Sequence, residues 1–456
     1  MPSCRQAIQP QALGSPAFRK THEVRYAYIA GAMYQGIASP SLVARMARAR
    51  LLAYLGSGGL ALSRVEADLV SLVGELPPDA PFGANLLHHP DDPSFEQATV
   101  ELYLRHGLRR VEASAFLEIT PALVRFRLSG VRRSENGTLN CSHHILAKVS
   151  RPEIARQFLS TAPPEIVAHL RDTGQISAEQ AELAAYVSIA DDLCVEADSG
   201  GHTDQGVAYA LLPTILMLRE QIAQTYPAAA EVRVGAAGGL GTPHALAAAF
   251  VLGADFVMTG SINQCTVEAG TSNRVKEMLQ QAGSQDTAIV PAGDMLEIGA
   301  KMQVFRRGLL FPARATRLYE LYRDYAGWSE IPPEIRHQIE TRYFRRSFAE
   351  VVDELRTYYS AIAPERWSAA ERNPRQLLAM VCRWYFHHTT QWALKGAPDR
   401  EVDYQIHCGP ALGAFNAWVQ GTRLSDWRER HVDEIAERLM SATAELLSQR
   451  FEAFYQ

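Results

Sequence analysis

Paired cysteines are missing from this chain of 456 residues. Its six cysteines stand singly, and no C-x-x-C motif occurs; they are Cys4, Cys141, Cys194, Cys265, Cys382 and Cys408. This spacing excludes a disulfide framework and indicates no cysteine-based metal site, so we expect no bound metal. Unpaired cysteines fit a reducing compartment, and we expect the protein to be cytoplasmic.

Long hydrophobic runs are also missing. The longest candidate, Ala245–Met258, is interrupted by Asp255 and is shorter than the roughly 18 residues that a membrane span needs. The first residues, MPSCRQAIQPQALG, lack the basic-then-apolar pattern of a signal peptide. A net charge of −5 gives no overall reason to expect nucleic acid or an anionic membrane as partner.

The dinucleotide motif G-x-G-x-x-G does not follow a first strand, which argues against a Rossmann fold that binds NAD. Instead, eight short apolar runs alternate with helical patterns, and almost every run ends in small or polar residues. Such runs are typical of parallel strands that are buried on both faces. They are Tyr26–Met33, Leu51–Gly56, Phe82–His88, Arg109–Ser114, Ile145–Ser150, Leu193–Ser199, Val232–Gly238 and Asp255–Ser261.

Eight strand–helix units over about 240 residues predict an α/β protein with a (β/α)8 TIM barrel. We place the barrel at residues 21–290, after an irregular N-terminal arm at 1–20. Two extra helical patterns predict a helical insertion at about 151–188. All six tryptophans lie after residue 290, where helical spacing dominates, so we expect an α-helical C-terminal module at 291–456.

The strongest functional signal is the stretch VGAAGGLGTPHALAAAFVLGADFVMTGS, residues 234–261. It predicts strand, Gly-Gly turn, helix and second strand, so that Gly238, Gly239, Gly260 and Ser261 follow two adjacent strands. Backbone N–H groups in such glycine-rich loops can surround a phosphate, as they do after strands seven and eight of many barrels. We therefore expect a phosphorylated ligand here.

The sixth strand ends in EADSGGHTD, which places Asp198, Gly200, Gly201 and His202 at the catalytic end of a barrel. Two glycines let the backbone approach a ligand closely. An isolated histidine is usually structural, but His202 follows a Gly-Gly turn and has Asp198 and Asp204 nearby to orient it. We therefore predict that His202 donates a proton or polarises a carbonyl group.

Three further strand ends carry candidate ligands. Ala32 and Met33 would let a flat ring lie on the backbone, or would form only a packing turn. Asn85 could pair with a ring carbonyl or ring N–H, or could cap the next helix. Lys148 is unusual in an apolar run because burying an unpaired ammonium is costly, so it could offset negative charge on a reduced flavin or a phosphate. Together these residues favour flavin mononucleotide (FMN).

The segments AGAM, GANL, AKVS, VEADSGGHTD, VGAAGGLGTP and TGSINQCTVEAGTS resemble the PfaD-type trans-acting enoyl reductases of polyketide and polyunsaturated fatty acid synthases. The C-terminal segments VFRRGLLFPARATRLYELY, RWYF and DYQIHCGPALGAFNAW extend the resemblance over the chain from about residue 20. The nitronate monooxygenases and the flavin-dependent bacterial enoyl reductases are barrel relatives of this group and share its shorter glycine motifs.

The resemblance implies an FMN-containing barrel that reduces the α,β-double bond of enoyl thioesters on an acyl carrier protein, with NADPH as hydride donor. It places Met33, Asn85, Lys148, Gly238, Gly239, Gly260 and Ser261 around FMN and His202 beside the substrate. Lys148 is also a catalytic candidate. Departures from the family pattern are His407 before Cys-Gly-Pro, Gly293, and His387-His388-Thr389 after RWYF. They lie outside the cofactor loops and concern substrate preference.

Carrier proteins are usually acidic, so docking calls for a basic patch, although an arginine cluster is as often a solvated helix face. Two candidate clusters are Arg306, Arg307, Arg314, Arg317 and Arg323, and Arg342, Arg345 and Arg346. The Trp-rich C-terminal module offers a surface for a homodimer. Two alternative functions remain open at this point: a nitronate monooxygenase that uses His202 as a base, and a flavin-free scaffold within a synthase.

Overall fold

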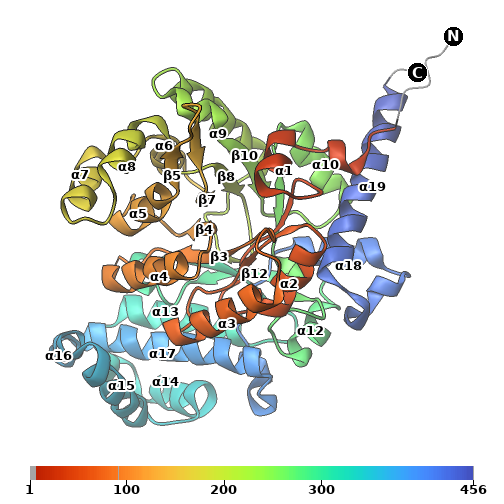
Figure 1. Ribbon diagram of the computed structural model, residues 1–456. Coiled ribbons are helices and arrows are strands. Elements are labelled where there is room, and N and C mark those ends of the chain that lie inside the picture. The colour runs from red at the N-terminus through yellow and green to blue at the C-terminus, as the bar shows by residue number, and fades with distance from the viewer. Residues whose placement is uncertain (1–6, 91, 455–456) are drawn as a thin grey trace. The chain divides into compact units, whose positions relative to one another are not determined.

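The computed structural model describes residues 7–90 and 92–454 (Figure 1). Residues 1–6 of the expected arm, with Cys4, lie outside the described residues. The chain divides into two compact units. The barrel unit comprises Met1–Asp198, Gln205–Gly270 and Ala417–Gln456, and the second unit comprises Ser199–Asp204 and Thr271–Asn416.

The barrel unit contains a closed barrel of parallel strands in the order β1-β11-β10-β8-β7-β4-β3-β2. All eight predicted strands are confirmed, each inside or overlapping its expected run, since apolar runs mark parallel strands well. Their bounds are β1 (Tyr28–Ala30), β2 (Leu52–Leu55), β3 (Phe82–Leu87), β4 (Arg110–Ser114), β7 (His144–Val149), β8 (Asp192–Glu196), β10 (Arg233–Ala237) and β11 (Val257–Thr259).

Among the described residues, twelve α-helices of the barrel unit follow or flank these strands. Several start with a Ser, Thr or Asp cap and a proline in the first turn, as in α2 after Ser39 and α10 after Thr242. The helices are α1 (Pro16–His22), α2 (Pro40–Arg48), α3 (Leu62–Glu75), α4 (Pro93–Arg105), α5 (Pro121–Ser129), α6 (Pro152–Leu159), α7 (Pro164–Asp172), α8 (Ala178–Leu183), α9 (Ala208–Ala223), α10 (Pro243–Val251), α11 (Ser261–Gln264) and α19 (Val432–Ala453). Helices α7 and α8 are the two helices expected in the segment 151–188.

Side chains on the barrel strands alternate between the interior and the surrounding helices. Leu146 on β7 and Cys194 on β8 belong to the apolar core of the barrel. Two residues further along the same strands, Lys148 and Glu196 face the same interior, because successive side chains point to opposite sides of a strand. The interior therefore changes from apolar to charged toward the carboxyl ends of the strands.

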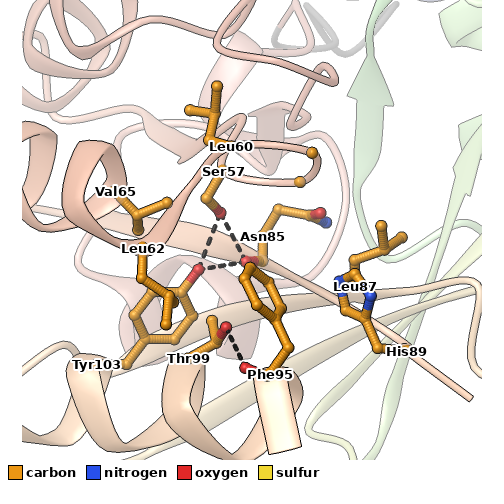
Figure 2. Close-up of a pocket in the computed structure, with 12 residues that line it drawn as sticks. Ser57, Leu60, Leu62, Val65, Asn85, Leu87, His89, Phe95, Thr99 and Tyr103 are labelled. Atoms are coloured by element: carbon orange, nitrogen blue, oxygen red, sulfur yellow. Dashed lines mark hydrogen bonds between the residues drawn. The ribbon is translucent and has the colours of Figure 1, made fainter. Parts of the chain in front are cut away.

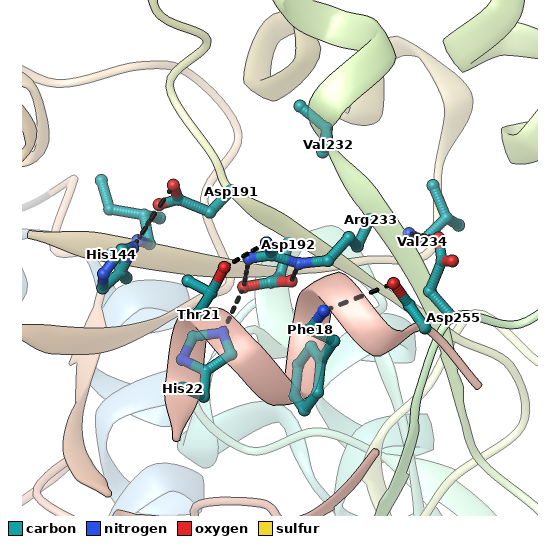
Figure 3. A network of polar contacts seen from close by, with 12 residues as sticks. Phe18, Thr21, His22, His144, Asp191, Asp192, Val232, Arg233, Val234 and Asp255 are labelled. Carbon is teal, nitrogen blue, oxygen red and sulfur yellow. Dashed lines mark hydrogen bonds and ion pairs between the residues drawn. The ribbon is translucent and has the colours of Figure 1, made fainter. Parts of the chain in front are cut away.

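Helix α1 lies at the amino-terminal ends of β8 and β10, where its His22 contacts Asp192 (Figure 3). Its Phe18 and His22 are fully buried. His22 Nε2 lies 2.8 Å from Asp192 Oδ2, and Arg233 donates to the same carboxylate at 2.6 and 2.9 Å. Arg110 Nε donates to His22 Nδ1 at 3.3 Å, so Nε2 carries the proton and donates to Asp192. Burial is the main reason that the pKa of His22 is lowered to about 4.

The expected irregular arm at 1–20 therefore differs from the structure, because residues 16–22 form this helix. The sequence PAFRKTH shows little apolar periodicity, since the helix buries a phenylalanine and a hydrogen-bonded histidine rather than an apolar stripe. Two short strands, β5 (Val131–Arg133) and β6 (Leu139–Cys141), form a hairpin that the sequence patterns did not indicate.

The second unit contains an antiparallel sheet in the order β12-β13-β9, in addition to the expected helices. Its strands are β9 (Gly201–His202), β12 (Thr287–Pro291) and β13 (Lys301–Phe305). An aromatic core includes Phe311, Tyr385 and Phe386. The helices are α12 (Asn273–Leu279), α13 (Phe311–Asp324), α14 (Pro333–Gln338), α15 (Phe348–Ile362), α16 (Pro364–Arg372), α17 (Pro374–Lys395) and α18 (Ala411–Val419), which carries the boundary to the barrel unit.

The unit boundaries differ from the expected module at 291–456. Helix α19 belongs to the barrel unit, where it packs along α10, and Thr443 Oγ1 reaches the Pro243 carbonyl oxygen at 3.5 Å. Local helical spacing predicts such a helix but not the surface on which it packs. None of the helices in the described ranges is long and apolar enough to cross a membrane.

Candidate functional site

The two glycine loops follow adjacent strands of the barrel, as expected from the sequence. Strand β10 pairs with β11, and the loops begin at Gly238 and Gly260. Gly238 and Gly239 have φ angles of +85° and +72°, which favour glycine. A Cβ atom added at Gly239 or at Gly260 would meet no protein atom within 4 Å. Both loops therefore border open space, and Ser261 begins α11 directly after the second loop.

The loop after β1 is held by a carboxylate that was not expected from the sequence. The Ala32 N–H donates to Glu112 Oε2 on β4 at 2.9 Å. The next residue, Met33, accepts a hydrogen bond from the Ala38 N–H at 3.3 Å. A Cβ atom at Gly56 would lie 1.8 Å from the Met33 carbonyl oxygen, so this loop needs glycine at position 56. The backbone at Ala32 and Met33 is therefore fixed from two sides.

Asn85 is buried on β3, and both its backbone and its side chain form hydrogen bonds within the protein; Figure 2 shows those of the backbone carbonyl. Its carbonyl oxygen accepts hydrogen bonds from Ser57 Oγ at 2.7 Å and from Tyr103 OH. Its Nδ2 donates to the Glu112 carbonyl oxygen and to Ser114 Oγ, each at 2.9 Å. Both amide hydrogens are thus used within the protein, so Asn85 can offer a ligand only its Oδ1 acceptor. It does not cap a helix.

Lys148 forms an ion pair with a residue on the neighbouring strand. Its Nζ lies 3.0 Å from Glu196 Oε1, and the two side chains are 19% and 25% exposed. Burial opposes the charge of Lys148, but Glu196 and Glu112 raise its pKa above the ordinary value. Lys148 is therefore a fixed cation near the carboxyl ends of β7 and β8.

Glu112 connects these groups at the centre of the barrel. The residue is fully buried, and its Oε1 has no hydrogen-bond partner. Burial raises the pKa of Glu112 to about 7, and the attraction of Lys148 and the hydrogen bonds with Ala32 and Ser114 only partly oppose this. The missed signal was a glutamate in the apolar run RRVEAS, in register with Asn85 on β3.

The segment after β8 that was predicted to carry site residues, from Asp198 to His202, is divided between the two units. Asp198 belongs to the barrel unit, and its N–H donates a hydrogen bond to the Gly206 carbonyl oxygen at 3.0 Å. A Cβ atom added at Gly238 would lie 2.8 Å from the Asp198 carbonyl oxygen, so the two loops approach closely. Gly200, Gly201 and His202 belong to the second unit. Gly201 and His202 were expected in a turn but form strand β9, paired with Gln303 and Met302 of β13.

His202 is paired with a carboxylate that lies far away in the sequence. His202 Nε2 lies 2.9 Å from Asp294 Oδ1, and the His202 side chain is 48% exposed. Burial opposes ionisation of Asp294, but the hydrogen bond with His202 lowers its pKa. The orienting groups expected from the sequence were Asp198 and Asp204. Asp294 was not expected, because no local pattern links positions 202 and 294.

His407, one of the departures from the family pattern, lies in the same part of the second unit. Burial and, to a smaller extent, the nearby His202 lower the pKa of His407 to about 4. Gln405 Nε2 lies 2.7 Å from His407 Nε2, so this ring nitrogen accepts the hydrogen bond. Within residues 7–90 and 92–454, no group of three His, Cys, Asp or Glu residues is placed to hold a metal ion.

Most arginines of the two expected docking clusters are paired with carboxylates of their own unit. Arg314 contacts Asp403, which is fully buried and also accepts from Tyr385 OH at 2.7 Å, so Arg314 belongs to the core of the unit. Acidic neighbours also pair with Arg307, Arg317, Arg323, Arg345 and Arg346. Arg306 and Arg342 are exposed on the surface.

Two protein-family models match the chain. Residues 15–306 match the model described as nitronate monooxygenase. Residues 325–404 match the model described as the inserted helical domain of [acyl-carrier-protein] S-malonyltransferase. The first match spans the barrel strands and the second covers most helices of the second unit.

Similar proteins come from polyketide and polyunsaturated fatty acid biosynthesis. The polyketide biosynthesis protein PksE of Bacillus subtilis is 48% identical over 449 residues, which are 98% of this chain and 58% of PksE. A polyunsaturated fatty acid synthase protein of Thraustochytrium sp. is 41% identical over 416 residues, which are 90% of this chain and 28% of that protein. The chain thus spans about half or less of the length of these relatives.

Among solved structures, the enoyl reductase domain of MlnA, from the macrolactin biosynthesis cluster of Bacillus amyloliquefaciens, matches with a TM-score of 0.94 and 40% identity. The alignment covers 97% of this chain and 99% of that domain. FabK from Thermotoga maritima matches with a TM-score of 0.56 and 15% identity, which shows a shared fold.

Proposed function

The chain belongs to the nitronate monooxygenase family, and from this membership we propose that it is an FMN-dependent reductase of enoyl thioesters bound to acyl carrier proteins, with NADPH as hydride donor. Support comes from the 40% identity to the enoyl reductase domain of MlnA over nearly the whole chain. The polyketide and polyunsaturated fatty acid context comes from the names of the longer relatives and is carried over only as part of this proposal.

The observation that carries the proposal is the open space beside Gly239 and Gly260 on adjacent strands. Backbone at these loops would hold the phosphate of FMN, together with Gly238 and Ser261. When bound, FMN would supply hydride transfer from NADPH to the β-carbon of the enoyl thioester. The cradle fits this cofactor because neither loop carries a side chain at its open glycine.

The residues at the other strand ends would hold the isoalloxazine ring. Asn85 Oδ1 would accept a hydrogen bond from a ring N–H, because its own hydrogens are already donated to β4. The rigid backbone at Ala32 and Met33 would support the ring from one side. Lys148 would offset negative charge that develops at the ring on reduction, since it is a cation in a poorly solvated place.

His202 would act on the thioester rather than on the cofactor. The hydrogen bond to Asp294 holds its imidazole in one orientation, which is what a proton donor or carbonyl polariser requires. Asp198, Gly200 and Gly201 would position the segment that carries His202. The acyl carrier protein as partner agrees with relatives from polyketide and polyunsaturated fatty acid synthases.

The test is an anaerobic absorbance spectrum of the purified protein, recorded before and after NADPH and then after a crotonyl thioester. A flavin band that bleaches with NADPH and returns with the thioester supports the proposed reductase. A band that returns only with oxygen favours nitronate monooxygenase activity, which turnover of a nitroalkane would then establish. No flavin band after addition of FMN contradicts both enzymes and favours a scaffold.

A further inference from the structure

Glu112 stands out because it lies at the centre of the barrel site and yet has no role in the proposed chemistry. It is fully buried, and one carboxyl oxygen has no hydrogen-bond partner. Leaving such an atom unsatisfied in the interior is energetically costly, so an unpaired buried oxygen needs a reason. The other oxygen holds the loop at Ala32, which would require only an uncharged acceptor such as an amide oxygen.

The groups around Glu112 come from six strands or their ends, and none of them is a cation that pairs with Glu112 alone. They are the Ala32 N–H after β1, Tyr54 on β2, Asn85 on β3, Ser114 on β4, Lys148 on β7, and Cys194 and Glu196 on β8. Lys148 is the one cation among these groups, and its Nζ is bound to Glu196 at 3.0 Å. Lys148 and Glu196 together are neutral, so the charge of the cluster depends on whether Glu112 carries a proton.

We propose that Glu112 takes up a proton when negative charge is added beside Lys148, and that it thereby keeps the charge of the barrel site constant as the bound cofactor is reduced. The inference rests on the proposed function in one respect, namely that the cofactor is FMN. Glu112 would act as a positioning residue, since it holds the Ala32 loop and sets the electrostatic field without contacting the substrate.

The proton balance is simple. Reduction delivers two electrons and one proton to the ring and leaves one net negative charge near Lys148. A second proton comes from water and forms the O–H bond of the Glu112 carboxyl, and no bond of the protein breaks. Lys148 and Glu196 are partly exposed, which gives this proton a route to the buried carboxyl. Because burial raises the pKa of Glu112 to about 7, the proton can be gained and lost near neutral pH.

The first test is infrared spectroscopy of the cofactor-free protein as a function of pH. Wild type should show the carbonyl band of a protonated carboxylic acid that titrates near pH 7. Glu112→Gln should remove the band, because the amide keeps an acceptor for Ala32 but has no proton to exchange. Asp294→Asn is the matched control in the second unit and should keep the band. A band that persists in Glu112→Gln would overturn the assignment.

The second test measures the number of protons taken up per two electrons, from the pH dependence of the midpoint potential of the FMN-loaded protein. Above pH 7, wild type should take up close to one proton more than Glu112→Gln, and Glu112→Asp should restore part of the difference. Equal proton numbers in wild type and Glu112→Gln would show that Glu112 only holds the loop. Failure to bind FMN would instead reject the proposed function, before any variant is compared.

Discussion

His202 Nε2 and Asp294 Oδ1 lie 2.9 Å apart, although the two residues are separated by 92 positions in the chain. The pair belongs to the second unit, whose strand β9 carries His202. A histidine held by a carboxylate has a defined orientation and a stabilised charged form, which general acid catalysis uses.

Replacing His202 by Ala should leave FMN binding within about twofold of wild type and lower kcat for a crotonyl thioester by about a hundredfold or more. The cofactor loops lie elsewhere in the chain, so the yellow colour should remain. The measurement is steady-state turnover together with a flavin absorbance titration. His337→Ala, at an exposed position of α14, is the control and should retain full activity.

Asp294→Asn should lower kcat by about tenfold, which is less than the loss expected for His202→Ala, with little change in KM. Loss of the carboxylate should also move the alkaline limb of the kcat profile to lower pH, because the charged imidazole is no longer stabilised. Unchanged turnover in His202→Ala would remove this histidine from the mechanism.

Gly260→Ala should bind FMN about tenfold more weakly, or about 1.4 kcal/mol, without loss of folding stability. Its added methyl group would meet no protein atom within 4 Å, so only a ligand in the open space can oppose it. Thermal unfolding and FMN titration separate the two effects. Gly74→Ala on α3, where a methyl group also meets nothing, should change neither binding nor cofactor spectrum. Equal FMN affinity in the two variants would place the phosphate elsewhere.

Lys148→Met should weaken FMN binding or slow its reduction by NADPH by about tenfold or more, because a poorly solvated cation is lost and Glu196 keeps its charge without its partner. Stopped-flow bleaching of the flavin band measures the reduction rate. The double variant Lys148→Met/Glu196→Gln also removes the negative charge of Glu196. If the double variant regains the wild-type rate, the lysine serves only to neutralise Glu196.

His22 should make folding stability depend on pH between about 6.5 and about 4. Burial lowers the pKa of His22 to about 4 from 6.5, so in this window the unfolded chain binds a proton that the folded protein does not. Stability is therefore complete above pH 6.5 and falls as the pH decreases, by on the order of 2–3 kcal/mol at pH 4. Urea unfolding at several pH values measures this.

His22→Gln keeps a donor for Asp192 but cannot titrate, so it should show a shallower loss of stability between pH 6.5 and 4. His337→Gln should behave like wild type, because that position is exposed. Parallel pH curves for wild type and His22→Gln would mean that other groups cause the acid sensitivity.

The double substitution Arg306→Glu/Arg342→Glu should raise KM for a carrier-bound enoyl substrate by about tenfold and leave KM for a small thioester unchanged. These arginines are exposed, and exposed charges at an interface act mainly on the encounter of the partners. Arg323→Glu, which loses only its contact with Asp324, is the control. Equal KM values for carrier-bound substrate would reject docking at these two positions.

Much of the barrel could be predicted because local sequence reports it directly. Apolar runs such as Leu193–Ser199 marked the parallel strands, and the glycines at 238, 239 and 260 marked the open loops. Helix α1 was missed because it buries Phe18 and His22 without an apolar stripe. The sequence did not predict that α19 belongs to the barrel unit, because helical spacing does not indicate which surface a helix covers.

The sequence by itself determined the order of strands and helices, the two glycine loops and the presence of Asn85, Lys148 and His202 at strand ends, since periodicity and backbone freedom are local properties. Tertiary structure alone decided which charges face each other. The register of the closed barrel places Glu112 beside Asn85 and Lys148 beside Glu196. In the second unit, β9 pairs with β13, and His202 of β9 contacts Asp294. The shifts in pKa follow from burial and from such partners, and neither is visible from residues close in sequence.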